Sequence, residues 1–189
     1  MEDQLAKKRQ EDLLLSQQIN NHVLKINNSI SDVTDICQEV VDENQNLAKF
    51  LEITLKLGEP FSYNKQITPA TFTAIVDKKW LKILLQKLLE IGLFLSSPKK
   101  EAKVSITSLR VDDSIEVVIN FDYYIPDPAQ QGEIFIPDYG SLNSINNLKM
   151  GSGLEGYIAK SISDQLNIPI KVITKPEEKQ TSFVLYIHI

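Results

Sequence analysis

The chain has 189 residues, of which 42% are hydrophobic and 24% are charged. This ordinary globular balance excludes a disordered or low-complexity protein. The single cysteine, Cys37, cannot form an internal disulfide, and no Cys/His cluster has zinc-site spacing, so we expect no metal. The N-terminus lacks a secretory pattern and no segment is long and apolar enough to span a bilayer. We therefore expect a cytoplasmic protein with no membrane contact.

The net charge of −5 belongs to the first third of the sequence. Residues 1–60 carry 6 basic and 11 acidic residues, whereas residues 61–189 carry 14 of each. Neither part has the excess of positive charge that binding to a phosphate backbone requires. The charge distribution therefore argues against a nucleic-acid partner.

Residues 3–57 contain no glycine or proline and carry a heptad of apolar residues. The heptad consists of Ile19, Val23, Ile26, Ile30, Val33, Cys37 and Val40. Such a seam predicts a coiled coil with a helix of a second copy, and hence a homodimer. Two geometries fit: one helix of about 55 residues, or a hairpin that turns near residues 27–29, with Ser31 or Asp32 capping the second helix.

The pattern changes after Gly58, which predicts a helical segment over residues 1–58 and a separate unit over residues 59–189. Alternating and β-branched runs predict strands, and longer apolar runs predict helices. We expect strands at 71–76, 103–108, 114–120, 168–174 and 182–188, helices at 79–95 and 152–166, and a long loop at 123–150. The fold class is α+β, with a two-layer α/β sandwich whose sheet is covered on one face.

This order of elements, together with three motifs, resembles the ATP-binding domain of sensor histidine kinases. Asp77 and the apolar helix after it look like the family's first motif helix, and residues 134–137 (Ile-Phe-Ile-Pro) look like the segment before the mobile lid. Residues 151–154 (Gly-Ser-Gly-Leu), followed by Lys160, look like the end of the lid. The resemblance implies that residues 1–58 take the place of the dimerisation and histidine-phosphotransfer helices.

The two residues that contact metal and adenine in the family differ in this sequence. The family's asparagine, whose amide oxygen helps to hold Mg²⁺, corresponds to Ile91, which has no oxygen to offer a hard cation. The aspartate that recognises the adenine amino group corresponds to Asn120. The resemblance therefore implies a degenerate site without a metal ligand.

The glycines of the family's nucleotide site are only partly retained. Gly151 and Gly153 remain, but Asp122 and Tyr124 stand where two glycines let the backbone approach the nucleotide. Glu155 replaces a third glycine and adds negative charge to a phosphate-binding turn. We expect no bound nucleotide and no other cofactor. The remaining glycine loop has a simpler interpretation, as the cap of a helix that starts near Ser152.

His22 is the candidate phosphoacceptor, because its surroundings are similar to the family's phosphorylated motif. Leu24 and Lys25 match the hydrophobic and basic positions that follow the histidine. Val23 stands where an acidic residue assists proton removal, and Asn27 stands where the motif has proline. The match is therefore incomplete, and a solvated residue on a helix face is the competing interpretation of His22.

The resemblance implies a dimeric two-component signalling protein that has lost ATP binding. This pseudokinase would act as a scaffold or regulator of a response regulator receiver domain or of a histidine kinase, without ATP-dependent kinase activity. One alternative is a histidine phosphotransferase that uses His22. A further alternative is an active ATP-dependent histidine kinase.

Overall fold

The computed structural model describes residues 2–21, 23–63, 67–68, 70–126, 128–137 and 151–189. Four elements precede Gly58: α1 (Glu2–Asn21), β1 (Ser29–Asp32), α2 (Val33–Phe50) and β2 (Thr54–Leu57). The elements after it are β3 (Phe61–Ser62), β4 (Thr73–Val76), α3 (Lys78–Ser96), β5 (Lys103–Val111), β6 (Ser114–Phe121), α4 (Pro128–Glu133), α6 (Glu155–Leu166), β7 (Ile170–Lys175) and β8 (Gln180–His188).

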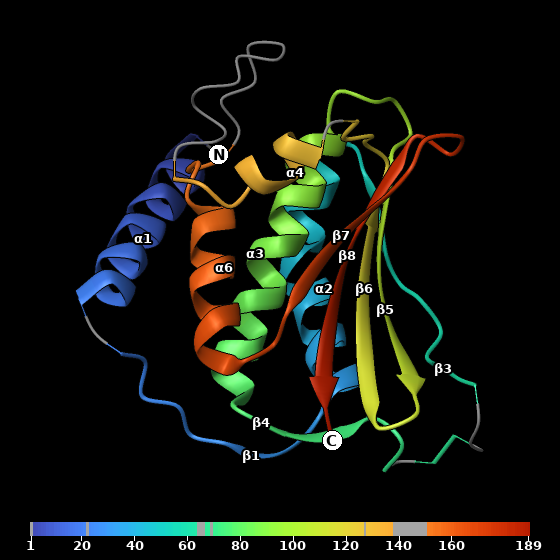
Figure 1. Cartoon of the computed structure of the whole chain (residues 1–189). Coiled ribbons are helices and arrows are strands. Elements are labelled where there is room, and N and C mark those ends of the chain that lie inside the picture. The colour runs from blue at the N-terminus through green and yellow to red at the C-terminus, as the bar shows by residue number, and fades with distance from the viewer. Residues whose placement is uncertain (1, 22, 64–66, 69, 127, 138–150) are drawn as a thin grey trace.

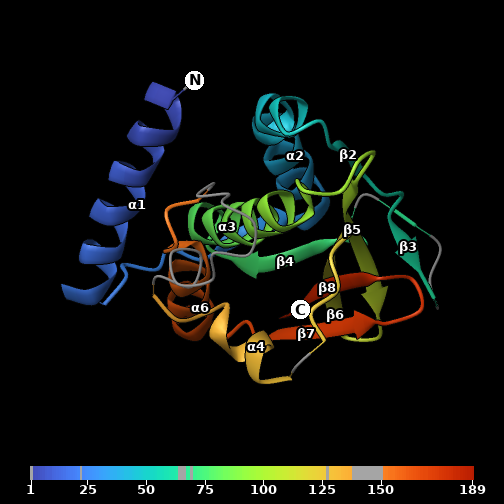
Figure 2. The ribbon, with the colours of Figure 1, turned by 90° about the horizontal axis from the view of Figure 1, so that it is seen from above.

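The main sheet has the strand order β2-β5-β6-β8-β7, and β3 pairs with β5 outside this path. Only β2 and β3 run parallel to their neighbour β5. Helices α2, α3 and α6 lie on one face of the sheet, and β1 pairs with β4 in a separate two-stranded ribbon below them (Figures 1 and 2). The predicted α/β sandwich, covered on one face, is confirmed.

Aspartate side chains fix the starts of the two central helices. The Asp32 carboxylate accepts hydrogen bonds from the backbone N–H groups of Thr34 (2.8 Å) and Asp35 (3.1 Å), which start α2. The Asp77 carboxylate accepts one from Trp80 N–H (3.0 Å) at the start of α3. These bonds satisfy amide groups that have no partner within the helix. The Asp32 cap expected for a second helix is therefore present.

Of the two geometries left open for residues 3–57, the structure excludes the single continuous helix, and the coiled coil with a second copy stays a prediction. The first helix ends at Asn21, and residues 29–32 form β1, which pairs antiparallel with β4. Val33, Cys37 and Val40 are buried in the chain's own core, whereas Val23 and Ile30 are exposed. Burial accordingly raises the pKa of the Cys37 thiol well above its ordinary value. The fold thus divides the seam between the core and the surface of the chain.

Residues on both sides of Gly58 share the same layers. Strand β2 pairs with β5, and α2 packs against α3 and β5. The domain boundary at residue 58 stays a prediction about folding units, and the packing places α2 and β2 with the residues that follow. None of the described helices combines the length and apolar composition needed to cross a bilayer.

Candidate functional site

The retained glycine loop forms a cap at the N-terminus of α6. Gly153 has a φ of 78°, a backbone conformation that favours glycine. The Ser152 hydroxyl accepts a hydrogen bond from Leu154 N–H (3.1 Å), and the Glu155 carboxylate accepts one from Ser152 N–H (2.7 Å). Serine and glutamate have the spacing of a capping box, but the hydroxyl bonds the amide two residues further on rather than three, and the N-cap residue of α6 is Leu154. The geometry supports the helix-capping interpretation of this loop.

Glu155 belongs to a group of ionisable side chains from three helices, called here the buried charge cluster: Asp12, Lys87, Glu90 and Glu155. The Lys87 ammonium lies 2.5 Å from an Asp12 oxygen and 3.0 Å from a Glu90 oxygen. The Ser152 hydroxyl donates to the other Asp12 oxygen (2.8 Å), and Lys8 pairs with Glu90 at the edge of the cluster. These contacts join α1 and α3 to the capped end of α6.

Burial and the charges of neighbouring side chains shift the pKa values of two members of the cluster. Burial raises the pKa of Glu155, and the negative charges of Glu90 and Asp12 raise it further, against hydrogen bonds from the Ser152 and Glu155 amides. Burial alone would lower the pKa of Lys87, but the charges of Glu90 and Asp12 outweigh it and raise that pKa. Lys87 therefore remains an ammonium, and Glu155 takes up a proton more readily than an ordinary glutamate.

The three carboxylates of the cluster are the group best placed to ligate a cation among the described residues. One oxygen from each of Asp12, Glu90 and Glu155 lies within 4.8 Å of the others. Carboxylate oxygens suit a hard cation such as Mg²⁺. Here, however, the Lys87 ammonium already bonds two of these residues. The cluster therefore contains its own counter-charge.

Ile91 and Asn120, the predicted vestigial metal and adenine positions, do not face each other across a cavity. Ile91 is part of the hydrophobic core. Asn120 lies in β6 between two buried residues, so its side chain is on the sheet face opposite the helices, where its amide oxygen accepts a hydrogen bond from the Ser182 hydroxyl (2.5 Å). The position of Asn120 is thus remote from the buried charge cluster.

Phe121, rather than Asn120, points toward the helices at the end of β6. Its ring lies 5.0 Å from that of Phe183, between centroids. A Cβ atom at Gly92 of α3 would lie 3.2 Å from Phe121, so this glycine lets the ring approach the helix closely. Phe135, from the segment before the predicted lid, lies 6.1 Å from Phe183. Aromatic side chains therefore fill the space between α3 and this end of the sheet.

Asp122 has a structural environment of its own. Its carboxylate accepts hydrogen bonds from Lys103 N–H (3.0 Å) and the Gln180 amide (2.8 Å), and it pairs with Lys99 (3.0 Å). Burial would raise its pKa, but these hydrogen bonds and the Lys99 charge hold the pKa below the ordinary value. Asp122 thus ties the ends of β5, β6 and β8 together, while Tyr124 nearby is half-buried.

Of the vestigial positions, the structure brings only Gly151, Gly153 and Glu155 together, at the capped end of α6. His22 and residues 138–150, the predicted lid, lie outside the described residues. Gly156 was not among the predicted site residues. It lets α6 approach the segment before the lid so closely that a Cβ atom at this position would lie 1.8 Å from the Ile134 carbonyl oxygen.

Three members of the buried charge cluster were not among the residues predicted from the sequence: Asp12, Lys87 and Glu90. Two signals pointed to part of it. Lys87 and Glu90 are charged residues three apart within an apolar helix, and Ser152 and Glu155 have the spacing of a capping box. Asp12 gave no signal, because a carboxylate on a polar helix usually faces solvent.

Comparison with known proteins identifies the fold. No family model matches the sequence, and no curated protein gives a significant match. Among solved structures, the histidine kinase AdeS of Acinetobacter baumannii matches 94% of this chain and 75% of its own, with a TM-score of 0.67 and 16% identity. The mycobacterial sensor histidine kinase MprB matches 86% of this chain and 97% of its own, with a TM-score of 0.65 and 17% identity.

The catalytic domain of the histidine kinase ThkA is a further match. It covers 86% of this chain and 95% of its own length, with a TM-score of 0.61 and 16% identity. This match includes residues before Gly58, because residues 59–189 make up less than three quarters of the chain. The chain therefore has the fold of the sensor histidine kinase core.

The buried charge cluster predicts a large effect of removing its lysine. Lys87→Met leaves three buried carboxylates without their main counter-charge, so we expect the free energy of unfolding to fall by about 3–5 kcal/mol. Lys82→Met, on the same helix, removes surface pairs with Glu39 and Glu43 and should cost less than about 1 kcal/mol. Urea unfolding measures the stability of both variants. Equal losses of stability would contradict the role of Lys87 as the main counter-charge of the cluster.

The raised pKa of Glu155 predicts a stability difference that depends on pH. The unfolded chain ionises Glu155 at lower pH than the folded chain does, so this residue lowers the free energy of unfolding as pH rises through that interval. The Glu155→Gln variant has no carboxyl group to ionise at this position, so its free energy of unfolding does not fall for this reason. Urea unfolding at pH 4 and pH 8 should show the variant gaining stability relative to the native chain at the higher pH. A difference that stays constant or reverses would refute the raised pKa.

Proposed function

We propose that this chain is a two-component signalling protein whose histidine-kinase-type core does not use ATP. It would act by binding a receiver domain or a histidine kinase as a scaffold or regulator. One observation carries the proposal: the N-terminus of α6 holds the chain's own Glu155 carboxylate, and Asp12 of α1 binds the same turn through Ser152.

The capped turn leaves little attraction for a phosphate. A helix N-terminus binds phosphate through free N–H groups and the positive end of its dipole. At this turn the Ser152 and Leu154 amides already bond side chains of the loop. Each ionised carboxylate about 4 Å from a phosphate oxygen would add repulsion of roughly 4 kcal/mol at the effective dielectric of a protein surface. The turn therefore favours its internal carboxylate over a triphosphate.

Helix α1 would also have to move before the turn could open. Arg9 donates to the Gly151 carbonyl oxygen (3.2 Å), and Tyr157 of α6 donates to Asn20 near the end of α1. Beyond α1, Leu24 N–H donates to the Gln165 side chain (2.7 Å) near the C-terminus of α6. These contacts lie near the start and the end of α6, beside which α1 runs (Figure 1), and they support a fixed brace rather than a mobile phosphotransfer helix.

We also place the start of the ATPase-like unit near Ser29 rather than at residue 59. The ThkA catalytic domain matches more of this chain than residues 59–189 contain, and β2 and α2 belong to the sheet and the helical layer. Residues 29–57 would then belong to the ATPase-like unit, with α1 as the described helix before it.

The first test is nucleotide binding. Ile91 offers no metal ligand, and the capped turn repels phosphate, so calorimetric titration with Mg-ATP should give no binding isotherm up to millimolar nucleotide. The catalytic domain of an active histidine kinase, titrated in parallel, provides the control. A micromolar dissociation constant for this chain would contradict the loss of ATP binding.

The second test concerns phosphoryl transfer through His22. We expect no acid-labile, base-stable phosphate after incubation with phosphorylated receiver domains, because Val23 supplies no carboxylate to assist proton removal. His22→Gln should therefore leave receiver or kinase binding unchanged, and its stability should change by less than about 0.5 kcal/mol. Label on the native chain that is absent from the variant would establish the phosphotransferase instead.

A further inference from the structure

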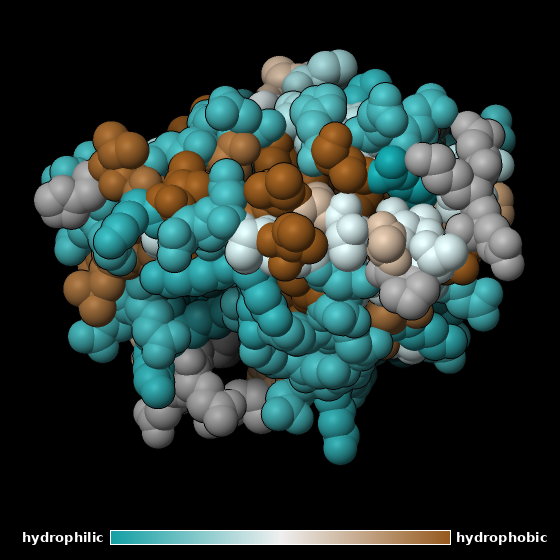
Figure 3. All heavy atoms as spheres, turned by 90° about the horizontal axis from the view of Figure 1, so that it is seen from below, coloured by the Kyte–Doolittle hydropathy of each residue, from teal (hydrophilic) through white to brown (hydrophobic). Residues whose placement is uncertain are grey.

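The opposite end of the molecule carries uncovered aliphatic side chains, on a surface called here the ribbon face: residues 23–30, Ile75 of β4, and residues 77–80 at the start of α3. Val23 is 89% exposed, Ile30 is 79% exposed and Ile75 is 68% exposed. Ile30 and Ile75 are direct partners across the β1–β4 ribbon. Figure 3 shows the hydrophobic spheres gathered across this side of the molecule. Apolar side chains exposed next to one another, unlike single scattered ones, are a feature of interaction sites.

A groove of about 650 Å³ adjoins these side chains. Its lining combines apolar and cationic residues, chiefly Val23, Leu24, Lys25, Lys78, Lys79 and Trp80. Ser29 lines the groove and also begins β1, so the groove is continuous with the ribbon. The ribbon face thus offers both a hollow and an apolar surface to one partner.

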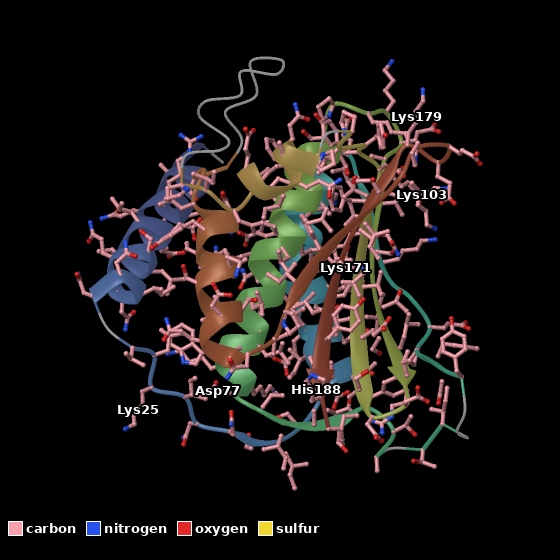
Figure 4. The ribbon with its side chains drawn as sticks, viewed as in Figure 1. Lys25, Asp77, Lys103, Lys171, Lys179 and His188 are labelled. Carbon is pink, nitrogen blue, oxygen red and sulfur yellow. The ribbon has the colours of Figure 1, made fainter. Side chains whose placement is uncertain are left out.

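Internal hydrogen bonds hold the groove in shape. The buried Asp77 carboxylate accepts from Asn27 N–H (2.6 Å) and from Trp80 N–H (3.0 Å). The Trp80 indole donates to the Lys25 carbonyl oxygen (3.3 Å). Figure 4 shows Asp77 at the start of α3 and Lys25 on the neighbouring segment. Because Asp77 is already engaged by the chain's own amides, it does not offer its carboxylate to a ligand.

The groove presents positive charge although the chain as a whole is acidic. Lys78 pairs with Glu39 (2.7 Å), and the Lys79 ammonium lies 4.6 Å from the centre of the Trp80 ring. Within the part of the chain that the structure describes, no ion pair involves Lys25 or Lys79. Two cations without carboxylate partners therefore lie beside the exposed aliphatic residues.

We propose that the ribbon face binds an amphipathic acidic segment of a partner protein. Its apolar side chains would contact Val23, Ile30 and Ile75, and its carboxylates would approach Lys25 and Lys79. Charge argues against a second copy as the occupant, because a two-fold axis pairs the same patch with itself and would bring these lysines close to their equivalents. The inference deepens the proposed docking role and rests on it, but it does not depend on whether ATP binds.

Two synthetic helical peptides with the same leucine positions test the proposal, one flanked by glutamates and the other by lysines. Fluorescence anisotropy with the full chain should show binding of the glutamate peptide at least about tenfold tighter than binding of the lysine peptide. Ile30→Asp should weaken it about tenfold. Ile136→Asp, at an exposed isoleucine outside the ribbon face, should leave it unchanged. The double variant Lys25→Glu/Lys79→Glu should reverse the preference between peptides.

Equal binding of the two peptides, or binding that Ile30→Asp does not affect, would overturn the proposal. Light scattering provides a second check: a native dimer at tens of micromolar that Ile30→Asp converts to a monomer would assign the ribbon face to self-association instead. Both substituted isoleucines are exposed, so the variants should retain the native circular dichroism spectrum. An absence of peptide binding would not change the expected absence of Mg-ATP binding, because the buried charge cluster lies further along α3, away from the ribbon face.

Discussion

The ammonium of Lys87, buried between Asp12 and Glu90, is the interaction on which the arrangement of the helices depends. It places one positive charge from α3 among three carboxylates that come from three helices. Without α1, Lys87 and Ser152 would lose their Asp12 partner, and without Lys87 the carboxylates would repel one another in a medium that solvates them poorly. The position of α1 and the capped start of α6 are therefore coupled through a single buried charge.

Helix α3 runs from the ribbon face to the buried charge cluster. Asp77 at its start shapes the groove of the ribbon face, and Glu90, about 20 Å further along the helix axis, belongs to the buried charge cluster. At one end the chain satisfies its polar groups internally, whereas at the other it leaves aliphatic and cationic groups uncovered. That contrast is what favours a binding function over chemistry on a nucleotide.

The sequence predicted the elements after residue 70 closely, because the alternation in β6 and most of β5 and the apolar runs of β8 and α3 leave little ambiguity. Over residues 23–32 it left a single helix and a hairpin open, because Ile26 and Ile30 continued a helical spacing. The chain forms β1 there because it pairs with β4, more than forty residues further along, which a local pattern does not reveal. At the site, Glu155 stood out as a departure from the family motif, but the position of the neighbouring Asp12 depends on how α1 packs and had no local signal.

The central claim is that the N-terminus of α6 is occupied by the chain's own carboxylate and does not receive phosphate. Titration of isotopically labelled protein with Mg-ATP, followed by the backbone amide resonances of residues 151–156, tests it most directly. Our account predicts that the Ser152 and Leu154 resonances do not move up to millimolar nucleotide, because both amides remain bonded to the side chains of Glu155 and Ser152. Saturable shifts confined to these amides would contradict it, since they would place the triphosphate at the turn that Glu155 fills.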